Sequence, residues 1–533
     1  MYQISNSYIS SNDSTEVALR PGLPPLMSVG DKIATSRPPR TVFRNAVRAR
    51  AQRFPQQGYK LLVMSNRAPI RIVRDLAGER IEPTVGGVGS TFQRLLEEHG
   101  GTWIAWPGGR TLQKRVAMPP HAPSFDLVFA DLSERDVSNF YYGMCNQGLW
   151  PLMHYMAPIC HFNRVQWNNY QRVNMNFASL AAAEASSSSV VWVQDFHLAI
   201  TPMMIRARRP ELPIGLFWHV PFPPQELFRV FPWRRELLAG MLGSDLIGFH
   251  TPAYVTHFER ACERILGAQV DFDRGEIHFG GRTVKVGAFP LGIAVSYFEE
   301  LAENPRVRDR AARLRRSFGE NHRIILGVDR LDYTKGLLQR ILGFERFLER
   351  NPSAHRNVSL VLIAVPSRTR IRDYSDLKRQ VDEQVGRIIG RFSSEGWVPI
   401  RYLYTQFETE ELVPYYQASD VALLTPLRDG MNLVAKEYVA SRPDNDGVLI
   451  LSEFAGAAEE MTDALLVNPY DLDQIAARIE EALEMPVQQQ VARMSALRAK
   501  LRANDLESWS TTFLDSLIGR RALEQPAAEL TAD

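Results

Sequence analysis

Short apolar runs, separated by longer segments with helical spacing, recur along the chain from about residue 58. In chain order they are YKLLVMSN, VVWVQDF, IGLFWHVPF, LIGFH, VKVGAFPLG, RIILGVDRL, VSLVLIAV, VALLTPL and GVLILSE. Such continuous runs are typical of strands buried on both faces of a parallel sheet, and the helical segments fit the crossovers of βαβ units. The pattern predicts an α/β protein with Rossmann-like, doubly wound sheets.

Two such sheets fit a chain of 533 residues, because domains average roughly 150 residues. We expect an N-terminal Rossmann-like domain over residues 58–294 and a C-terminal one over residues 295–503, facing each other across a cleft. Residues 504–533 are predicted to hold a helix that packs back on the N-terminal domain, followed by a tail.

The segment before the first predicted strand has a different texture. Residues 1–57 lack apolar periodicity, and the stretch from Lys32 to Arg53 is mostly basic. We expect a flexible basic extension that folding does not require. An alternative for TVFRNAVRARAQRF is an amphipathic helix that touches a partner or an anionic surface.

Composition narrows the classes of function. The formal net charge is +2 with both signs interspersed, which disfavours a nucleic-acid surface or a basic membrane patch. No apolar run approaches the roughly 20 residues of a membrane helix, and the first 30 residues lack a signal-peptide core. The three widely spaced cysteines fit a reducing compartment. We expect a soluble, cytoplasmic homo-oligomer that binds no nucleic acid and no membrane.

Polar or glycine-containing turns follow many of the predicted strands. In doubly wound folds the carboxyl ends of the strands form the ligand crevice, so these turns make up the candidate site. They are Ser65-Asn66-Arg67, Gln194-Asp195, His219, Asp329-Arg330 and Arg428-Asp429-Gly430.

The most charged of these turns lies in LLTPLRDGMNLVAKEYVA, residues 423–440. A helix beginning near Gly430 would direct the free backbone N–H groups of Met431, Asn432 and Leu433 towards the crevice, where they favour a phosphate. An ordinary capped helix with surface charges is the alternative, but the turn as a block favours a bound anion.

Two carboxylates suggest what accompanies that phosphate. Glu437 follows Leu433 by four residues and shares its helix face, so it could accept two ribose hydroxyls. Asp429, in the turn itself, could accept from sugar hydroxyls. Taken alone, Glu437 and Lys436 would be read as surface charges. Together with the phosphate site they indicate a nucleotide-sugar.

A pair of cations follows another strand, in ILGVDRLDYTKGL. Arg330 and Lys335 are released into a loop that closes at Gly336. They can flank a diphosphate and neutralise a departing nucleoside diphosphate without a metal. The sequence has no His, Cys or Asp cluster with metal-ligand spacing, so we expect neither a metal nor a cofactor.

A glycine loop, TVGGVGS, precedes a helical pattern in the first half of the chain. It fails as GxGxxG because the third glycine position is Phe92, and nothing matches GxxxxGK[ST], so a dehydrogenase or a P-loop nucleotidase is disfavoured. Gly86 and Gly87 still allow the backbone to approach a phosphate or a sugar closely. A plain tight turn is the alternative.

Asp195 and His219 each follow an apolar strand and would open on the same crevice. In a desolvated site they could orient a sugar hydroxyl and donate to a departing or attacking oxygen. A helix cap and a core histidine are the alternatives for either residue alone. We interpret His197, close by, as structural.

Taken together, these stretches closely resemble trehalose-6-phosphate synthases, retaining glycosyltransferases of family 20 with the two-domain GT-B fold. The resemblance runs from about residue 60 to about 520 and rests on SNRAP, the glycine loop, YYGMCNQGLWPLMHY, VWVQDFHL, FWHVPFP, GVDRLDYTKG, VPSR and LLTPLRDGMNLVAKEYVA. It implies transfer of glucose from UDP-glucose to glucose 6-phosphate, with retention at the anomeric carbon and no metal.

The resemblance also implies roles for individual residues. Donor contacts, joined with the turns described above, fall on Gly86, Gly87, Arg330, Lys335, Phe407, Asp429, Gly430, Met431, Asn432, Leu433 and Glu437. Acceptor contacts fall on Arg67, Tyr141, Trp150, Asp195 and Arg368. The catalytic candidates are His219, beside the reacting centre, Asp195, Arg330 and Lys335.

The acceptor leaves alternatives open. Arg67 and Arg368 would bind its phosphate, and Tyr141 and Trp150, nine residues apart around two glycines, would form two sides of a pocket for a pyranose ring. The chain departs from the family at Met144-Cys145-Asn146 and at Gln194. One rival is a glucosylglycerol-phosphate synthase that uses glycerol 3-phosphate. Another is a non-catalytic sugar-phosphate sensor, which the intact charged residues of the donor site disfavour.

Overall fold

The computed structural model describes residues 58–75, 78–83, 87–109, 111, 113–119, 121–319 and 321–524. The predicted extension over residues 1–57, Gly86 of the glycine loop and the end of the predicted tail lie outside the described residues. In the described part of the chain, none of the helices is both long enough and apolar enough to span a bilayer.

Ten of the described strands form the N-terminal sheet, in the order β10-β11-β12-β9-β8-β7-β1-β4-β6-β5. Their bounds are β1 Lys60–Arg67, β4 Gly101–Trp106, β5 Arg115–Met118, β6 Phe125–Phe129, β7 Ser189–Gln194, β8 Ile214–Phe217, β9 Leu246–Phe249, β10 Gln269–Asp271, β11 Glu276–Phe279 and β12 Arg282–Ala288. The strands from β12 to β6 run parallel; β5 pairs antiparallel with β6 at one edge, and at the other edge β11 pairs antiparallel with β12 and with β10. A separate antiparallel ribbon joins β2 (Ile70–Asp75) to β3 (Gly78–Pro83).

The C-terminal sheet is entirely parallel over its described strands, in the order β15-β14-β13-β16-β17-β18. Their bounds are β13 Arg323–Arg330, β14 Val358–Val365, β15 Ile400–Leu403, β16 Val421–Leu424, β17 Val448–Ser452 and β18 Leu465–Val467. Counted from β13, this is the 3-2-1-4-5-6 order of a Rossmann sheet. The predicted α/β class and its parallel sheets are confirmed.

Helices connect the strands in both sheets. In the N-terminal half they are α2 Gly87–His99, α3 Glu134–Asp136, η1 Val137–Leu149, α4 Trp150–Met153, η2 Ala157–Ile159, α5 Arg164–Glu184, η3 Phe196–Leu198, α6 Thr201–Arg206, α7 Gln225–Phe228, α8 Arg234–Met241, α9 Pro252–Ala261 and η4 Cys262–Leu266. In the C-terminal half they are α10 Val295–Glu303, α11 Pro305–Arg316, η5 Tyr333–Lys335, α12 Leu337–Arg350, η6 Pro352–Ala354, α13 Arg372–Phe392, α14 Thr409–Ala418, α15 Leu433–Ala440, η7 Gly456–Glu459, α16 Leu472–Glu484, α17 Val487–Ala503 and α18 Leu506–Glu524.

Both faces of the N-terminal sheet are buried, which explains why its strands read as continuous apolar runs. Along β1, Leu61 and Val63 pack into one core, whereas Leu62 and Met64 pack into another on the opposite face. Successive side chains of a strand point to opposite faces, so a strand covered on both sides has no polar alternation.

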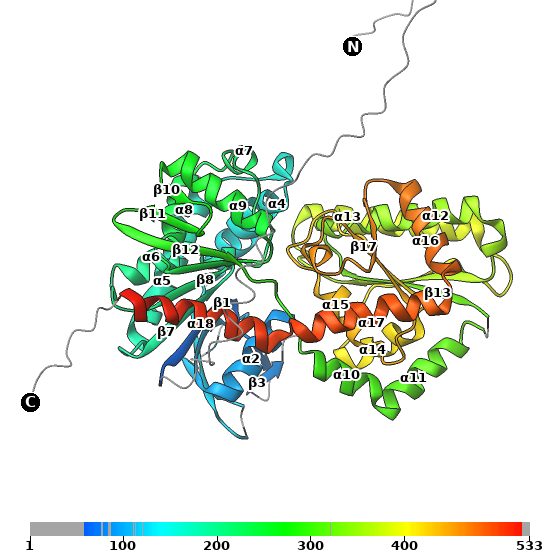
Figure 1. Cartoon of the computed structure of the whole chain (residues 1–533), viewed down its shortest axis with the longest axis horizontal. Coiled ribbons are helices and arrows are strands. Elements are labelled where there is room, and N and C mark those ends of the chain that lie inside the picture. The colour runs from blue at the N-terminus through cyan, green and yellow to red at the C-terminus, as the bar shows by residue number, and fades with distance from the viewer. Residues whose placement is uncertain are drawn as a thin grey trace, which may run out of the picture. The chain divides into compact units, whose positions relative to one another are not determined.

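The last helix, α18, lies across the N-terminal sheet, with α17 leading to it along the C-terminal domain (Figure 1). The ring of Phe513 stacks on Trp192 at 4.8 Å between centroids. A Cβ on Gly215 of β8 or on Gly248 of β9 would lie 2.8 Å from that same phenyl ring. The two glycines therefore make room for the helix on the sheet.

Replacing Trp509 tests how much α18 contributes to the stability of the folded chain. Its side chain is 2% exposed, and its ring lies 4.9 Å from that of Phe217 and 5.1 Å from that of Trp192. We expect Trp509→Ala to lower the free energy of unfolding by about 3–5 kcal/mol, because it leaves a large cavity. Urea unfolding followed by circular dichroism measures this. The exposed Tyr470→Ala is the control, with a change within about 0.5 kcal/mol; equal losses in the two variants would contradict the prediction.

Candidate active site

The two switch points of strand order bring the candidate residues together. Consecutive connections leave β1 in one direction and β7 in the other, and they do the same at β13 and β16. Ligands of doubly wound folds bind outside the carboxyl ends of the strands at these points. Arg67 and Asp195 lie at the first switch point, and Arg330 and Asp429 lie at the second.

Contacts between the two sets of strand ends define one site. The guanidinium of Arg368, after β14, lies 4.1 Å from the ring of Trp150, and that of Arg330 lies 5.4 Å from the same ring. The hydroxyl of Tyr254, on α9, donates to the backbone oxygen of Asp429 at 3.3 Å. Candidate residues more than a hundred positions apart in the sequence thus share one crevice.

Gly430 lies where two backbone segments of the site come into close contact. A Cβ at this position would lie 2.2 Å from the carbonyl oxygen of His219, and a Cβ on Gly456 would lie 2.0 Å from the carbonyl oxygen of Gly430. These distances are impossible for real side chains, so both positions require glycine. The turn after β16 therefore packs directly on the chain that follows β8.

The helix after this turn begins later than predicted. Residue Gly430 was the expected start, but α15 begins at Leu433, with Asn432 as its N-cap. Asn432 has φ +79°, a left-handed conformation that interrupts the helix, and its Oδ1 accepts from the N–H of Ala435 at 3.0 Å. The N–H groups of Met431 and Asn432 consequently belong to the turn instead of to a helical first turn.

Lys335 and Asp429 form an ion pair across the second switch point. The Lys335 ammonium donates to the Asp429 carboxylate at 2.5 Å, and both side chains are largely buried. Burial favours the protonated acid, but the charge of Lys335 outweighs it and holds the pKa of Asp429 below its usual range. The Nδ2 of Asn432 donates to the same carboxylate at 3.1 Å.

Glu437 and Lys436 differ in their environments, although both could have been surface charges. Glu437 is half-buried and accepts from the hydroxyl of Tyr416 at 2.9 Å, and burial raises its pKa. Lys436 is fully buried, and its ammonium donates to Glu460 at 2.6 Å and to the carbonyl of Leu291 at 2.7 Å. The surface alternative for Lys436 is therefore wrong.

The remaining donor candidates lie on elements around α15. Leu433 is half-buried at the first position of α15, one turn before Glu437. Phe407 is half-buried against Tyr415 of α14, with ring centroids 5.2 Å apart. Gly87 begins α2. The hydroxyl that binds Glu437 comes from the same helix as Tyr415, so α14 supports two of the candidates.

Arg67 is directed into the site by an irregularity of β1. Its pairing with β4 shifts between Ser65 and Arg67, which leaves Asn66 as an extra residue. The Arg67 guanidinium then lies 4.2 Å from the ring of Trp106 and 5.1 Å from that of Tyr141. Burial alone would raise the pKa of Tyr141, but the nearby arginines lower it.

Tyr141 and Trp150, which we predicted to form two sides of a pocket, are joined by helix, without a turn at the two intervening glycines. They belong to one continuous helical stretch, η1 followed by α4. η1 is a π-helix, whose i→i+5 hydrogen bonds widen each turn, so nine residues make about two turns. The two aromatic residues therefore lie on one helix face.

The ring of Trp150 is already covered by protein. Besides Arg368 and Arg330, the imidazole of His154 lies 4.1 Å from it between centroids, and Trp150 is only 7% exposed. In this state the indole supports two arginines instead of offering an open wall to a sugar.

Asp195 holds a strained backbone conformation at the end of β7. Its φ of +69° and ψ of 171° lie in a region that is essentially restricted to glycine. Its carboxylate accepts from the N–H of His219 at 3.1 Å and lies 3.6 Å from Nδ1 of His197. His197 also stacks on Tyr141, with ring planes 16° apart, so it joins the site although the sequence interpretation left it out.

His219 is neutral at pH 7, because burial lowers its pKa to about 4. Its Nε2 faces Oε1 of Gln194 at 2.9 Å, so Nε2 carries the proton in this arrangement. Its Nδ1 has no hydrogen-bond partner within the described residues and is an acceptor. Nδ1 is buried and unprotonated, and the Nε2 proton is engaged by Gln194, so in this arrangement the ring has no proton free for the donation that we predicted. Gln194, one of the departures from the family, fixes this tautomer.

The sequence interpretation missed Asp332, Tyr374 and His154. Asp332 is fully buried and accepts from Arg368 at 3.0 Å and from the hydroxyl of Tyr374 at 3.1 Å. The sequence signal available for Asp332 was its place between two cationic residues, Arg330 and Lys335, in RLDYTKG. No signal marked the other two, whose roles depend on tertiary contacts.

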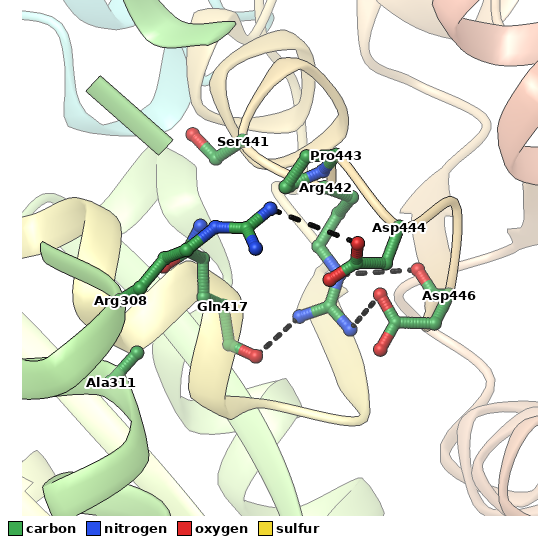
Figure 2. Close-up of a pocket in the computed structure, with 8 residues that line it drawn as sticks. All are labelled: Arg308, Ala311, Gln417, Ser441, Arg442, Pro443, Asp444 and Asp446. Carbon is green, nitrogen blue, oxygen red and sulfur yellow. Dashed lines mark hydrogen bonds and ion pairs between the residues drawn. The ribbon is translucent and has the colours of Figure 1, made fainter. Parts of the chain in front are cut away.

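A separate cavity of about 230 Å³ lies between α11 and the turn after α15 (Figure 2). Arg442 dominates it, but its guanidinium donates to the backbone oxygens of Tyr416, Gln417 and Ser419 and pairs with Asp446. Arg442 therefore fixes the end of α14, whose Tyr416 hydroxyl binds Glu437. In the described residues, no group of three His, Cys, Asp or Glu side chains is arranged to hold a metal ion.

Stability should depend on pH through His154, which is buried and has a pKa lowered to about 4 by burial. As pH falls from about 6.5 to about 4, the unfolded chain binds a proton that the folded chain does not, so stability falls by about 1.4 kcal/mol per pH unit for this residue. We expect His154→Gln to show a shallower fall than the wild type in urea titrations. The exposed His278→Gln should keep the wild-type slope; identical slopes in all three proteins would refute this.

Comparisons with known proteins place this geometry in a family. A family model described as glycosyltransferase family 20 matches residues 59–518. A trehalose-6-phosphate synthase of Mycolicibacterium vanbaalenii is 40% identical over 480 residues, covering 88% of this chain and 97% of that protein. A bifunctional trehalose-6-phosphate synthase/phosphatase of Thermoproteus tenax is 40% identical over 477 residues, or 87% of this chain, which spans 64% of that relative's length.

A solved structure agrees in fold. An α,α-trehalose-phosphate synthase (UDP-forming) from Burkholderia xenovorans, in complex with glucose-6-phosphate, matches with a TM-score of 0.80 at 35% identity, covering 86% of this chain and 100% of that one. With its two Rossmann-like sheets and the matched residues 59–518, this chain belongs to glycosyltransferase family 20.

Proposed function

We propose that this chain transfers glucose from UDP-glucose to glucose 6-phosphate with retention of configuration, giving trehalose 6-phosphate and UDP. One observation carries the proposal: Arg330 and Arg368, from the C-terminal sheet, stand over Trp150, and Arg67, from the N-terminal sheet, stands over Tyr141 of the same helical stretch. Arg330 with Lys335 can receive a diphosphate, and Arg67 with Arg368 can receive a phosphate. The names of the relatives support the same pair of substrates.

On the donor side, Arg330 and Lys335 bind the diphosphate and stabilise the charge that develops when the bond from the glucose carbon to the diphosphate oxygen breaks. Lys335 is paired with Asp429 in the present state, so the diphosphate competes with that carboxylate for the ammonium. Asp429 is then free to accept from a glucose hydroxyl. Glu437, whose second oxygen is not used by Tyr416, accepts from the ribose.

The backbone supplies the rest of the donor site. The N–H groups of Gly430, Met431, Asn432 and Leu433 line the turn, and Gly87 begins the helix of the glycine loop. Phe407 borders the base or the ribose from the side of α14. These contacts need no side-chain charge, so they accommodate a neutral nucleoside next to its diphosphate.

On the acceptor side, Arg67 and Arg368 bind the phosphate, with Tyr141 and Trp150 behind them. Asp195 orients the attacking hydroxyl, and His219 borders the reacting centre, with its backbone N–H held by Asp195 and its ring held by Gln194. Glycerol 3-phosphate would use the same arginines, so the phosphate alone does not select the acceptor.

The deciding experiment incubates the purified chain with UDP-glucose and either glucose 6-phosphate or glycerol 3-phosphate and identifies products by mass spectrometry and NMR. We expect trehalose 6-phosphate and UDP from the first mixture, and a far lower kcat/KM with the second acceptor. Exclusive use of glycerol 3-phosphate would favour the glucosylglycerol-phosphate alternative, and the absence of transfer to both would favour a sensor. Cytoplasmic location and homo-oligomerisation stay predictions.

Lys335→Ala and Arg330→Ala should each lower kcat by about two decades while changing the KM for glucose 6-phosphate little. The reason is that loss of a desolvated charge contact to the leaving diphosphate costs on the order of 3 kcal/mol in the transition state. Steady-state kinetics with varied acceptor measures both constants. Lys378→Ala, which removes a surface ion pair with Asp382, is the matched control. Turnover near the wild-type rate in both site variants would rule out their assigned role.

Transfer should also proceed without a divalent cation. Arg330, Lys335 and the backbone of the turn supply the positive charge that a metal would otherwise provide for the diphosphate. We expect the rate in excess EDTA to equal the rate in added Mg²⁺ within about twofold. Complete loss of transfer in EDTA, restored by a divalent cation, would show that the site is incomplete as described.

A further inference from the structure

Asp332 occupies a position between the donor and acceptor arginines that no catalytic role explains. It follows β13, is fully buried, and uses both carboxylate oxygens. Oδ1 accepts from the N–H and the hydroxyl of Thr334, at 3.0 and 2.9 Å. Oδ2 accepts from Arg368 and from the hydroxyl of Tyr374. A carboxylate with this many donors is fixed in place and available to fix others.

Oδ2 of Asp332 connects the two arginines that the proposed function assigns to different substrates. The Arg368 guanidinium lies 3.0 Å from it, and that of Arg330 lies 4.0 Å from it. Both guanidiniums also stand over the indole of Trp150. Two like charges in so small a space repel each other, and a buried carboxylate between them offsets that repulsion.

Arg368 and Arg330 differ in how freely their side chains can move. The Arg368 side chain is 7% exposed and its backbone has φ +45°, a left-handed conformation that is unusual for arginine. The Arg330 side chain is 44% exposed and makes the longer contact. Arg368 is therefore held firmly by its surroundings, whereas Arg330 can move towards a ligand and keep Asp332 as its neighbour.

The carboxylate keeps its charge under working conditions. Burial alone would raise the pKa of Asp332, but the charges of Arg368 and Arg330 lower it to about 2. It is therefore an anion at neutral pH, with or without a bound substrate.

We propose that Asp332 is a positioning residue, which holds Arg368 for the phosphate of the acceptor and keeps Arg330 beside it for the diphosphate of the donor. It touches neither substrate and acts through the two guanidiniums. The inference rests on the proposed function, because it assigns Arg368 and Arg330 to a phosphate and a diphosphate.

The test is a double-mutant cycle on acceptor kinetics. Asp332→Asn keeps the shape of the side chain but cannot hold two cations, so we expect the KM for glucose 6-phosphate to rise by at least about 30-fold. In an Arg368→Ala background, the same substitution should change KM by less than about threefold, because its effect is transmitted through Arg368. Equal effects in both backgrounds, or a KM like the wild type in Asp332→Asn, would overturn the proposal.

A matched control separates positioning from general stability. Asp420 also bridges two arginines, Arg315 and Arg323, but it precedes β16, at the amino ends of the strands, whereas Asp332 follows a strand of the same sheet at its carboxyl end. Asp420→Asn should lower thermal stability and leave the KM for the acceptor within about twofold of the wild type. A rise in KM that matches the Asp332 variant would show that loss of any buried aspartate has this effect, and it too would overturn the proposal.

A second variant tests the proposal in case Asp332→Asn does not fold. Tyr374→Phe removes one hydroxyl from the same oxygen and keeps the carboxylate. It should raise the KM for glucose 6-phosphate several-fold in the wild-type background and leave it unchanged in the Arg368→Ala background. No rise would count against the proposal. A wild-type chain that makes no trehalose 6-phosphate would instead overturn the proposed function, and calorimetric binding of glucose 6-phosphate to the wild type and the variants would then decide the inference.

Discussion

The charge balance around Trp150 is the constraint on which the site depends. Four cations, Arg67, Arg330, Lys335 and Arg368, lie at or just after strand ends of the two sheets, and burying Lys335 and Arg368 without anions would be costly. Asp332 and Asp429 compensate Arg368 and Lys335 directly, and Asp195 lies close by with His197. The buried cations are therefore already paired with carboxylates, and a phosphate that bound here would exchange partners with them, so part of its binding energy would be spent on breaking ion pairs.

Two glycines, Gly430 and Gly456, allow close backbone contacts between the two halves of the site. Gly430 lets the turn after β16 meet the backbone after β8 with no side chain between them, and Gly456 continues the stack on the other side. The main chain of His219 therefore lies directly against the turn after β16 of the C-terminal sheet, and its ring is held by Gln194, at the end of β7 in the N-terminal sheet. Any shift of that turn is transmitted directly to His219.

The sequence predicted what local patterns determine. Strand ends follow from apolar runs and the residues after them, so Arg67, Asp195, Arg330 and Asp429 were placed correctly at or just after the ends of buried strands. It could not predict which of these charges pair, because Lys335 and Asp429 are 94 residues apart and meet only in the folded chain. The π-helix was missed as well, since its wider turn arises from tertiary packing and leaves no distinct spacing of apolar residues in VSNFYYGMCNQGL. The start of α15 was set too early because nothing in the sequence marks Asn432 as left-handed.

The π-helix and the arginines together suggest how a helix face became a binding surface. A regular α-helix turns about 100° per residue, so residues nine apart point in opposite directions, and Tyr141 and Trp150 could not both face the arginines. The wider turn of η1 brings them to one side, where Tyr141 meets Arg67 and Trp150 meets Arg368. The energetic cost of the weaker π-helical geometry is thus offset by two cation–π contacts, to guanidiniums that come from different sheets. The helix irregularity, the aromatic spacing and the placement of the arginines therefore depend on one another.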